Sequence, residues 1–140
     1  MKRITRTLLL ALTLALSFTG CSNDDDLEEI FRNKNWNLTF VQNGTEKVVP
    51  QEDGYTLYFS ETGFTFTTPA GATAEGNWYA DGGSHTITFS DITASNAIND
   101  NPVAQAVITI LQNAVMYSGD ANWIQIIEEP GYRYMQFYNR

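Results

Sequence analysis

Residues 55–68 read YTLYFSETGFTFTT, and this stretch decides the expected fold class. An aromatic or aliphatic side chain stands at every second position of residues 55–60, and phenylalanine and threonine alternate through residues 64–68 after Gly63. Because successive side chains of a strand point to opposite faces, a period of two predicts strands with one buried face. Glycine between the two runs favours a turn, so the stretch predicts a β-hairpin.

Comparable short runs precede and follow this hairpin along most of the chain. Turn-forming residues separate them, as at Asn43-Gly44, Asp81-Gly82-Gly83 and Pro130-Gly131. Short alternating runs of this kind are typical of an all-β sandwich or barrel, and a meander of hairpins tends to close on itself and hide its edges. The expected strands cover residues 36–40, 55–60, 64–68, 73–80, 85–89, 114–118, 123–127 and 132–138.

The alternating pattern stops at residues 91–113, where the spacing of apolar residues changes. Val103, Val107 and Leu111 recur at every fourth position, and Pro102 suits the first position of a helix. This spacing predicts one short amphipathic helix over about residues 102–112, packed against an end or a flank of the sheet. The β-branched residues within 107–110 leave a strand open as the alternative.

The N-terminal residues are typical of a bacterial secretion signal. A basic start precedes an apolar stretch at residues 8–16, which is too short to cross a bilayer permanently. Residues 1–20 lead directly into Cys21, the only cysteine of the chain. The arrangement resembles a lipobox, which implies cleavage before Cys21 and attachment of lipid to its thiol. An ordinary signal peptide followed by a chance cysteine is the alternative.

The segment after Cys21 is acidic: residues 22–29 read SNDDDLEE and contain no base. Dense like charges repel one another and stay solvated, so residues 21–30 are expected to form a tether between lipid and domain. A calcium-binding loop is the alternative, but no glycine is present for the tight turn of an EF-type loop. An acidic run after an acylated cysteine resembles the surface-export signal of Bacteroidota lipoproteins. The resemblance implies an outer-membrane lipoprotein at the cell surface, with the periplasm-facing leaflet left open.

The charge balance narrows the choice of partners. The chain has 16 acidic and 8 basic residues, and residues 1–20 contain three of the bases and none of the acids. No basic patch is available to neutralise phosphates, so nucleic acid is excluded as an expected partner. The excess of acidic residues also argues against docking on an anionic membrane face. The expected link to the membrane is the lipid on Cys21.

Several motifs together resemble the small lipocalin-like domains of Bacteroidota lipoproteins. They are the early Trp36, the aromatic run at residues 55–59, Gly76-Asn77-Trp78, the helical excursion, and the Trp123 run followed by a last aromatic run. The likeness covers residues 34–140 and implies an antiparallel eight-stranded barrel. We therefore assign residues 31–140 to one lipocalin-like β-barrel domain, which we expect to be monomeric.

Two binding functions are expected for such a barrel. Eight strands leave an interior that side chains can fill or that admits one small ligand. The first function is therefore binding of a small, partly apolar molecule in a cup at one barrel mouth, lidded by the helix. The candidate ligand-binding residues are Trp36, Phe40, Phe59, Phe66, Trp78, His85 and Trp123. The second function is recognition of a glycan or a protein by exposed aromatic residues. Its candidates are Tyr58, Tyr79, Tyr132, Tyr134 and Tyr138.

The chemistry-bearing residues do not favour an enzyme. Ser84 and His85 are adjacent, and on a strand their side chains would leave opposite faces, so they cannot act as nucleophile and base. Glu128 and Glu129 are also adjacent, so on a strand their carboxylates would leave opposite faces and could not act as a catalytic pair. Cross-strand pairs, such as Glu75 with Asp81 or Asp91, stay open without a register. One histidine and one cysteine are too few ligands for a metal site built of imidazole and sulfur, so no cofactor or metal is expected.

Overall fold

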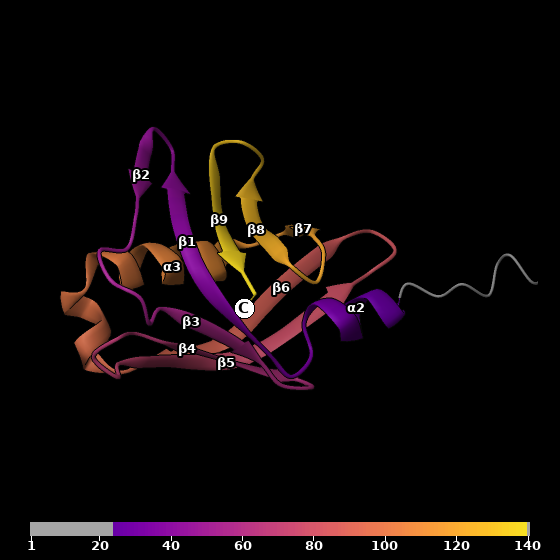
Figure 1. Cartoon of the computed structure of the whole chain (residues 1–140), viewed down its shortest axis with the longest axis horizontal. Helices are drawn as coiled ribbons and strands as arrows, with labels where there is room; N and C mark the ends of the chain where they lie inside the picture. Colours follow the sequence, from indigo (N-terminus) through magenta and orange to yellow (C-terminus); the bar gives the residue numbers. More distant parts are fainter. Residues whose placement is uncertain (1–23, 140) are drawn as a thin grey trace, which may run out of the picture.

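The computed structural model describes residues 24–139, so the predicted signal peptide (residues 1–20) and Cys21 lie outside the described part of the chain (Figure 1). Two α-helices, one 3-10 helix and nine strands follow one another in this part. Their bounds are α2 Asp24–Ile30, β1 Lys34–Asn43, β2 Glu46–Val48, β3 Thr56–Phe59, β4 Gly63–Thr67, β5 Thr73–Asp81, β6 Thr86–Ala94, η1 Asn96–Asp100, α3 Pro102–Asn113, β7 Met116–Gly119, β8 Trp123–Glu129 and β9 Arg133–Tyr138.

Eight of the strands form a closed antiparallel barrel. From β3 to β9 each strand pairs with the next along the chain, β1 pairs with β3, and β9 returns to pair with β1 at Val41 opposite Met135. The remaining strand, β2, only extends the end of β1 through a hairpin at Gly44. The predicted eight-stranded meander barrel is confirmed, and closure leaves the barrel strands with few free edges.

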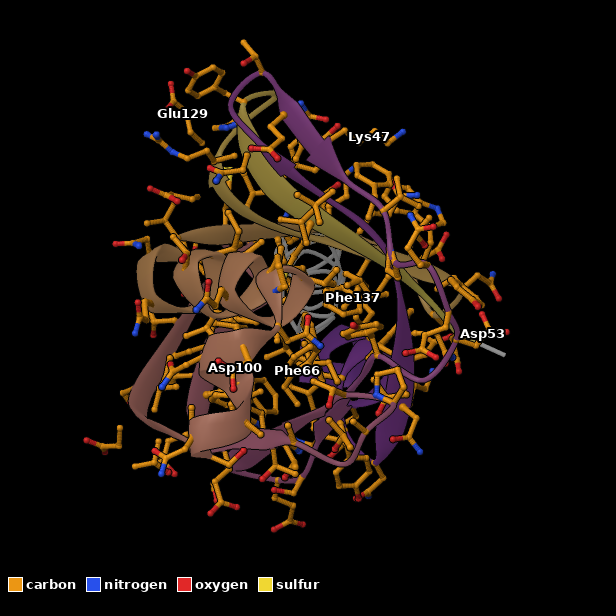
Figure 2. All side chains as sticks on the ribbon, turned by 90° about the vertical axis from the view of Figure 1, so that its left-hand side faces the viewer. Lys47, Asp53, Phe66, Asp100, Glu129 and Phe137 are labelled. Carbon is orange, nitrogen blue, oxygen red and sulfur yellow. The ribbon has the colours of Figure 1, made fainter. Side chains whose placement is uncertain are left out.

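The barrel interior is packed with large apolar side chains. Along β3 and β4 the inward residues Leu57, Phe59, Phe64 and Phe66 are at most 2% exposed, while their polar neighbours are half-buried. Figure 2 looks into the barrel from the α3 side, with Phe66 and Phe137 near its centre. Alternation of buried and exposed positions therefore produces the core that the sequence predicts.

A β-bulge in β1 changes the face to which its second half points. The pairing of β1 with β9 shifts between Leu38 and Phe40, so Thr39 is the extra residue. One extra residue moves every following side chain to the other face of the strand. Val41 is therefore buried inside the barrel, and Phe40, which the alternation within residues 36–40 would turn inward, lies half-buried on the outside.

The predicted helix is present as α3, with the expected start at Pro102. Asn101 caps it, because its side-chain oxygen accepts a hydrogen bond from the backbone N–H of Ala104 at 3.1 Å. Only Thr86 and Met116 form a ladder pair between β6 and β7, and α3 packs against β6, β8, β9 and β1 beside this opening. The helix therefore covers the weakest seam of the barrel with its buried residues Ala104, Val107, Ile110 and Leu111.

Residues 24–30, predicted to belong to a solvated tether, form helix α2 instead. Leu27 and Ile30 are buried against the barrel, and Phe31 is fully buried directly after the helix. The indole Nε1–H of Trp36 donates a hydrogen bond to the carbonyl of Ile30 at 3.1 Å, which ties the helix to β1. The acidic charges favour a solvated tether, but Leu27, Ile30 and Phe31 supply apolar area at helical spacing, and burial of this area favours docking.

Gly119, at the end of β7, should not tolerate a side chain. Its φ of +128° is a conformation that other residues rarely adopt, and an added Cβ would collide with the backbone carbonyl oxygen of Trp123. We expect Gly119→Ala to lower the free energy of unfolding by about 1–3 kcal/mol in urea denaturation. Gly71→Ala is the control, because Gly71 has a φ of +87° but no atom within 4 Å of an added Cβ. Equal losses for both variants would contradict the collision.

Candidate binding site

Four of the predicted ligand-binding residues belong to the packed core. Trp36, Phe59 and Phe66 are fully buried and Trp78 is 9% exposed. The rings of Phe59 and Trp78 pack edge to face with their centroids 5.3 Å apart. The indole Nε1–H of Trp78 donates to the carbonyl of Ser60 at 2.9 Å. These side chains occupy the barrel interior themselves.

The other three predicted ligand-binding residues lie outside the core. Phe40 is on the outer face because of the bulge, and Trp123 is 40% exposed at the start of β8. Alternation with Ile87 and Phe89 would place His85 on the inner face of a strand, but the structure does not place it there. The turn after β5 extends through His85, whose φ is +55°, and its side chain is exposed at the barrel end. The three residues do not meet at one mouth.

The outer side of β8, β9 and β1 brings together a regular set of uncharged side chains. The cross-strand register sets them in three rows, and eight of the nine residues are half-buried or exposed, while Ile127 is 7% exposed. We call this surface the aromatic–amide face. Its rows are Trp123–Tyr138–Asn37, Gln125–Gln136–Phe40 and Ile127–Tyr134–Gln42.

Contacts within the aromatic–amide face hold its side chains in place. Gln125 Nε2 donates to Gln136 Oε1 at 3.0 Å, and the rings of Phe40 and Tyr134 meet edge to face at 5.7 Å. Lys47 Nζ, from β2, lies 4.3 Å from the centre of the Phe40 ring at the margin of the face. Side chains that are already ordered lose less conformational entropy when a ligand binds them.

This combination of side chains suits one kind of chemistry. Each amide has both hydrogen-bond donors and acceptors, so it can pair with hydroxyl groups of a ligand. Aromatic rings offer rigid apolar area with a small entropy cost. The nine residues include no carboxylate, ammonium or guanidinium group, although the whole chain carries a net charge of −8. The face therefore fits a neutral ligand with many hydroxyl groups.

The predicted tyrosine surface is only partly assembled. Tyr134 and Tyr138 lie on the aromatic–amide face, but Tyr79 is on β5, across the barrel, and is 70% exposed. Tyr132 lies in the turn between β8 and β9, where its carbonyl accepts a hydrogen bond from the Gly44 N–H. Tyr58, on β3, donates to the side-chain oxygen of Asn33 at 3.2 Å. The amides of the aromatic–amide face were not predicted as site residues, because they form a pattern only when the register is known.

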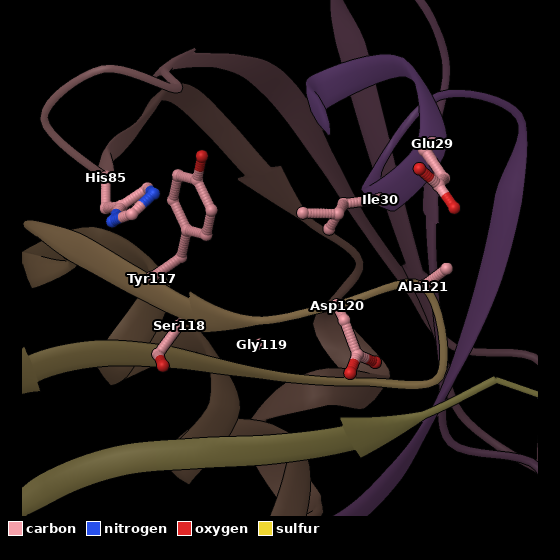
Figure 3. Close-up of a pocket in the computed structure, with 8 residues that line it drawn as sticks. All are labelled: Glu29, Ile30, His85, Tyr117, Ser118, Gly119, Asp120 and Ala121. Atoms are coloured by element: carbon pink, nitrogen blue, oxygen red, sulfur yellow. The ribbon is translucent and has the colours of Figure 1, made fainter. Parts of the chain in front are cut away.

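A small pocket lies at the barrel end beside α2 (Figure 3). Ile30 of α2 faces His85 and Tyr117 across the pocket. The rings of His85 and Tyr117 pack edge to face with their centroids 5.5 Å apart. Asp120 also lines the pocket, but its Oδ1 accepts the backbone N–H of Asn122 at 2.8 Å and so stabilises the turn. The pocket volume is about 290 Å³. Small-molecule sites usually have volumes of about 300–1,000 Å³, so this pocket lies at the lower limit.

The cross-strand carboxylates that the sequence left open lie on the outside of the barrel. Glu75 and Asp91 border one surface depression of about 400 Å³, where Asn77 Nδ2 donates to Asp91 Oδ2 at 3.2 Å. Within residues 24–139, no group of three or more histidine, cysteine or acidic residues is arranged to hold a metal ion. In the same part of the chain, no helix is long and apolar enough to cross a membrane.

The architecture defines the class: a closed, antiparallel, eight-stranded barrel with a packed interior. The model of one family, described as "Domain of unknown function (DUF4847)", matches residues 22–139, so the chain belongs to this family. It is similar to a crystal structure of a DUF4847 family protein from Bacteroides vulgatus ATCC 8482, with 24% sequence identity and a TM-score of 0.62. That match covers 81% of this chain and 97% of the other and supports the fold alone. No curated protein matches the chain.

Proposed function

We propose that the protein is a lipid-anchored, non-catalytic module that binds a neutral glycan on its aromatic–amide face. The observation that carries the proposal is the register of β8, β9 and β1, which sets rings and amides side by side, with Lys47 as a charged group only at the margin. Sugar rings present apolar C–H surfaces and many hydroxyl groups, so they can stack on aromatic rings and pair with amides.

The proposal includes anchoring at Cys21 and display on the outer membrane, at the cell surface. The support is the sequence of the first 29 residues, which combines a signal peptide, a lone cysteine and an acidic run. A protein displayed in this way meets polysaccharides, which fits a neutral-glycan face. Mass spectrometry of the membrane-extracted protein tests the anchor: a diacylglyceryl adduct on Cys21 is expected, and a chain that retains residues 1–20 would contradict it.

The packed interior favours this function over binding of an apolar molecule inside the barrel. The residues expected to line an apolar cup are themselves buried in contact with one another, and the pocket beside α2 is small and partly polar. A carrier of apolar molecules needs a hollow lined by such residues. The aromatic–amide face needs no rearrangement before it can meet a ligand.

A glycan array followed by calorimetric titration tests the proposed function. We expect binding to uncharged oligosaccharides and weaker binding to sulfated or carboxylated ones, because acidic residues outnumber basic ones by 16 to 8 and the nine residues of the face include no base, Lys47 lying only at its margin. Equal binding to acidic and neutral glycans, or no binding to any neutral glycan, would contradict the proposal.

A further inference from the structure

Helix α2 places the proposed anchor close to one end of the barrel. Asp24, the first residue of α2, is only three residues after Cys21. Three residues span at most about 11 Å, since a fully extended chain advances at most about 3.6 Å per residue. The distance between Cys21 and the start of the helix is therefore short, whatever the conformation of the intervening residues.

The helix itself is held against the barrel. Leu27 and Ile30 are each 8% exposed and Phe31 is fully buried. The Phe31 ring lies 5.0 Å from Phe59 and 4.9 Å from Tyr117, so it closes this end of the core. Because these contacts fix α2, a lipid on Cys21 would restrain the whole barrel.

Several other segments lie at the α2 end. The pocket beside α2 is bordered by the turn between β5 and β6 and by the turn between β7 and β8, which shows that both turns reach this end (Figure 3). Asn139 also lies here, since its N–H donates to the carbonyl of Asn122. At the opposite end, the β1–β2 hairpin and the β8–β9 turn are joined by the hydrogen bond from Gly44 N–H to Tyr132 O.

The surface of the α2 end also fits a bilayer interface. Glu29, exposed on α2, would be repelled by an anionic leaflet, whereas the neighbouring Glu28 is paired with Arg32 at 2.6 Å. The chemistry therefore fits a zwitterionic lipid surface.

From the short connection and this surface, we propose that the protein stands on the bilayer with its α2 end, which faces a zwitterionic lipid surface. The β1–β2 hairpin and the β8–β9 turn then point away from the membrane. The inference builds on the proposed anchor at Cys21. It places the Trp123–Tyr138–Asn37 row of the aromatic–amide face nearest to the lipid and the Tyr134 row farther out.

Paramagnetic broadening on nanodiscs tests this orientation whether or not the native protein is acylated. The isotope-labelled chain without residues 1–20 is coupled through Cys21, its only thiol, to a maleimide-bearing lipid in phosphatidylcholine nanodiscs that contain gadolinium-chelating lipid. We expect the amide signals of Ala121 and Asn122 to lose most of their intensity, while those of Gly44 and Gly131 keep theirs. The ten residues of β1 alone rise about 33 Å, so the two ends are well separated.

A long Gly-Ser linker inserted between Asn23 and Asp24 is the matched control. It leaves the barrel and the attachment point unchanged but removes the short connection, so the difference in broadening between the two ends should shrink. Equal broadening at both ends without the linker, or stronger broadening at Gly44 and Gly131, would overturn the proposed orientation. Absence of lipid on native Cys21, measured separately by mass spectrometry, would instead contradict the anchor.

Discussion

Replacing Phe31 with alanine should lower the free energy of unfolding by about 3–5 kcal/mol, the usual loss for a buried phenylalanine. Phe31 is fully buried. Its ring centroid lies 5.4 Å from that of Trp78, and the ring also packs against Phe59 and Tyr117. Removing the ring leaves a cavity at the α2 end, which the surrounding strands cannot fill without distorting the barrel. Urea denaturation followed by fluorescence measures the loss.

Phe40→Ala is the matched control for this prediction. This variant also removes a phenylalanine ring, but from the outer face of β1, where Phe40 contacts Tyr134 and Lys47. The expected loss is about 0.5–1.5 kcal/mol, the range of one aromatic pair. If Phe31→Ala cost no more than Phe40→Ala, residues 24–31 would not be part of the folded unit, and α2 would not restrain the barrel.

Replacing Trp123 or Tyr138 with alanine should weaken binding of a neutral glycan at least about tenfold, which corresponds to about 1.4 kcal/mol per substitution. The two residues are directly opposite each other on β8 and β9 and supply the aromatic part of the first row. Gln136→Leu should also weaken binding, because it removes the partner of Gln125 and one donor–acceptor group of the face. Calorimetric titration of each variant with the selected glycan measures the change.

Tyr79→Ala serves as the control for these variants. Tyr79 is the most exposed of the large hydrophobic residues identified in the described chain, at 70%, but it lies on β5 and outside the aromatic–amide face. Its removal should leave glycan affinity unchanged. Comparable losses for Tyr79→Ala and Trp123→Ala would mean that exposed aromatic residues bind non-specifically, and the proposed site would then fail.

The sequence was sufficient for the barrel because the pattern of burial is local. Most of the expected strands alternate apolar and polar residues, and turns such as Asn43-Gly44 and Pro130-Gly131 separate the strands. The helix was predictable for the same reason, since Pro102 and a four-residue apolar spacing mark its start and its buried face. Such signals depend on neighbouring residues and need no knowledge of distant contacts.

The errors arose where distant contacts overrule the local pattern. The bulge at Thr39 reverses the direction of Phe40, and it depends on the pairing of β1 with β9, almost a hundred residues later. Helix α2 contains many acids, yet Leu27 and Ile30 dock because the barrel offers an apolar end. His85 is in phase with the apolar alternation of the following strand, but it lies in the turn before β6, where its φ is positive.

The candidate site was less predictable than the fold. Trp123 and Tyr138 were both noted as aromatic residues, but their adjacency follows only from the register of β8 and β9. The amides at Asn37 and Gln136 carry no signal by themselves, because polar residues are expected on any outward face of a strand. Closure of the barrel between β1 and β9 is what turns these separate positions into one surface.

Chemical-shift mapping of the isotope-labelled protein during titration with the glycan selected on the array tests the central claim most directly. If the ligand binds the aromatic–amide face, the largest changes will be at amides of β1, β8 and β9, with the side-chain amides of Gln125 and Gln136 among them. Amides around His85 and Tyr117 will then change little. Changes concentrated at those two residues, or at Phe59 and Phe66 inside the barrel, would contradict a binding site on the outer face.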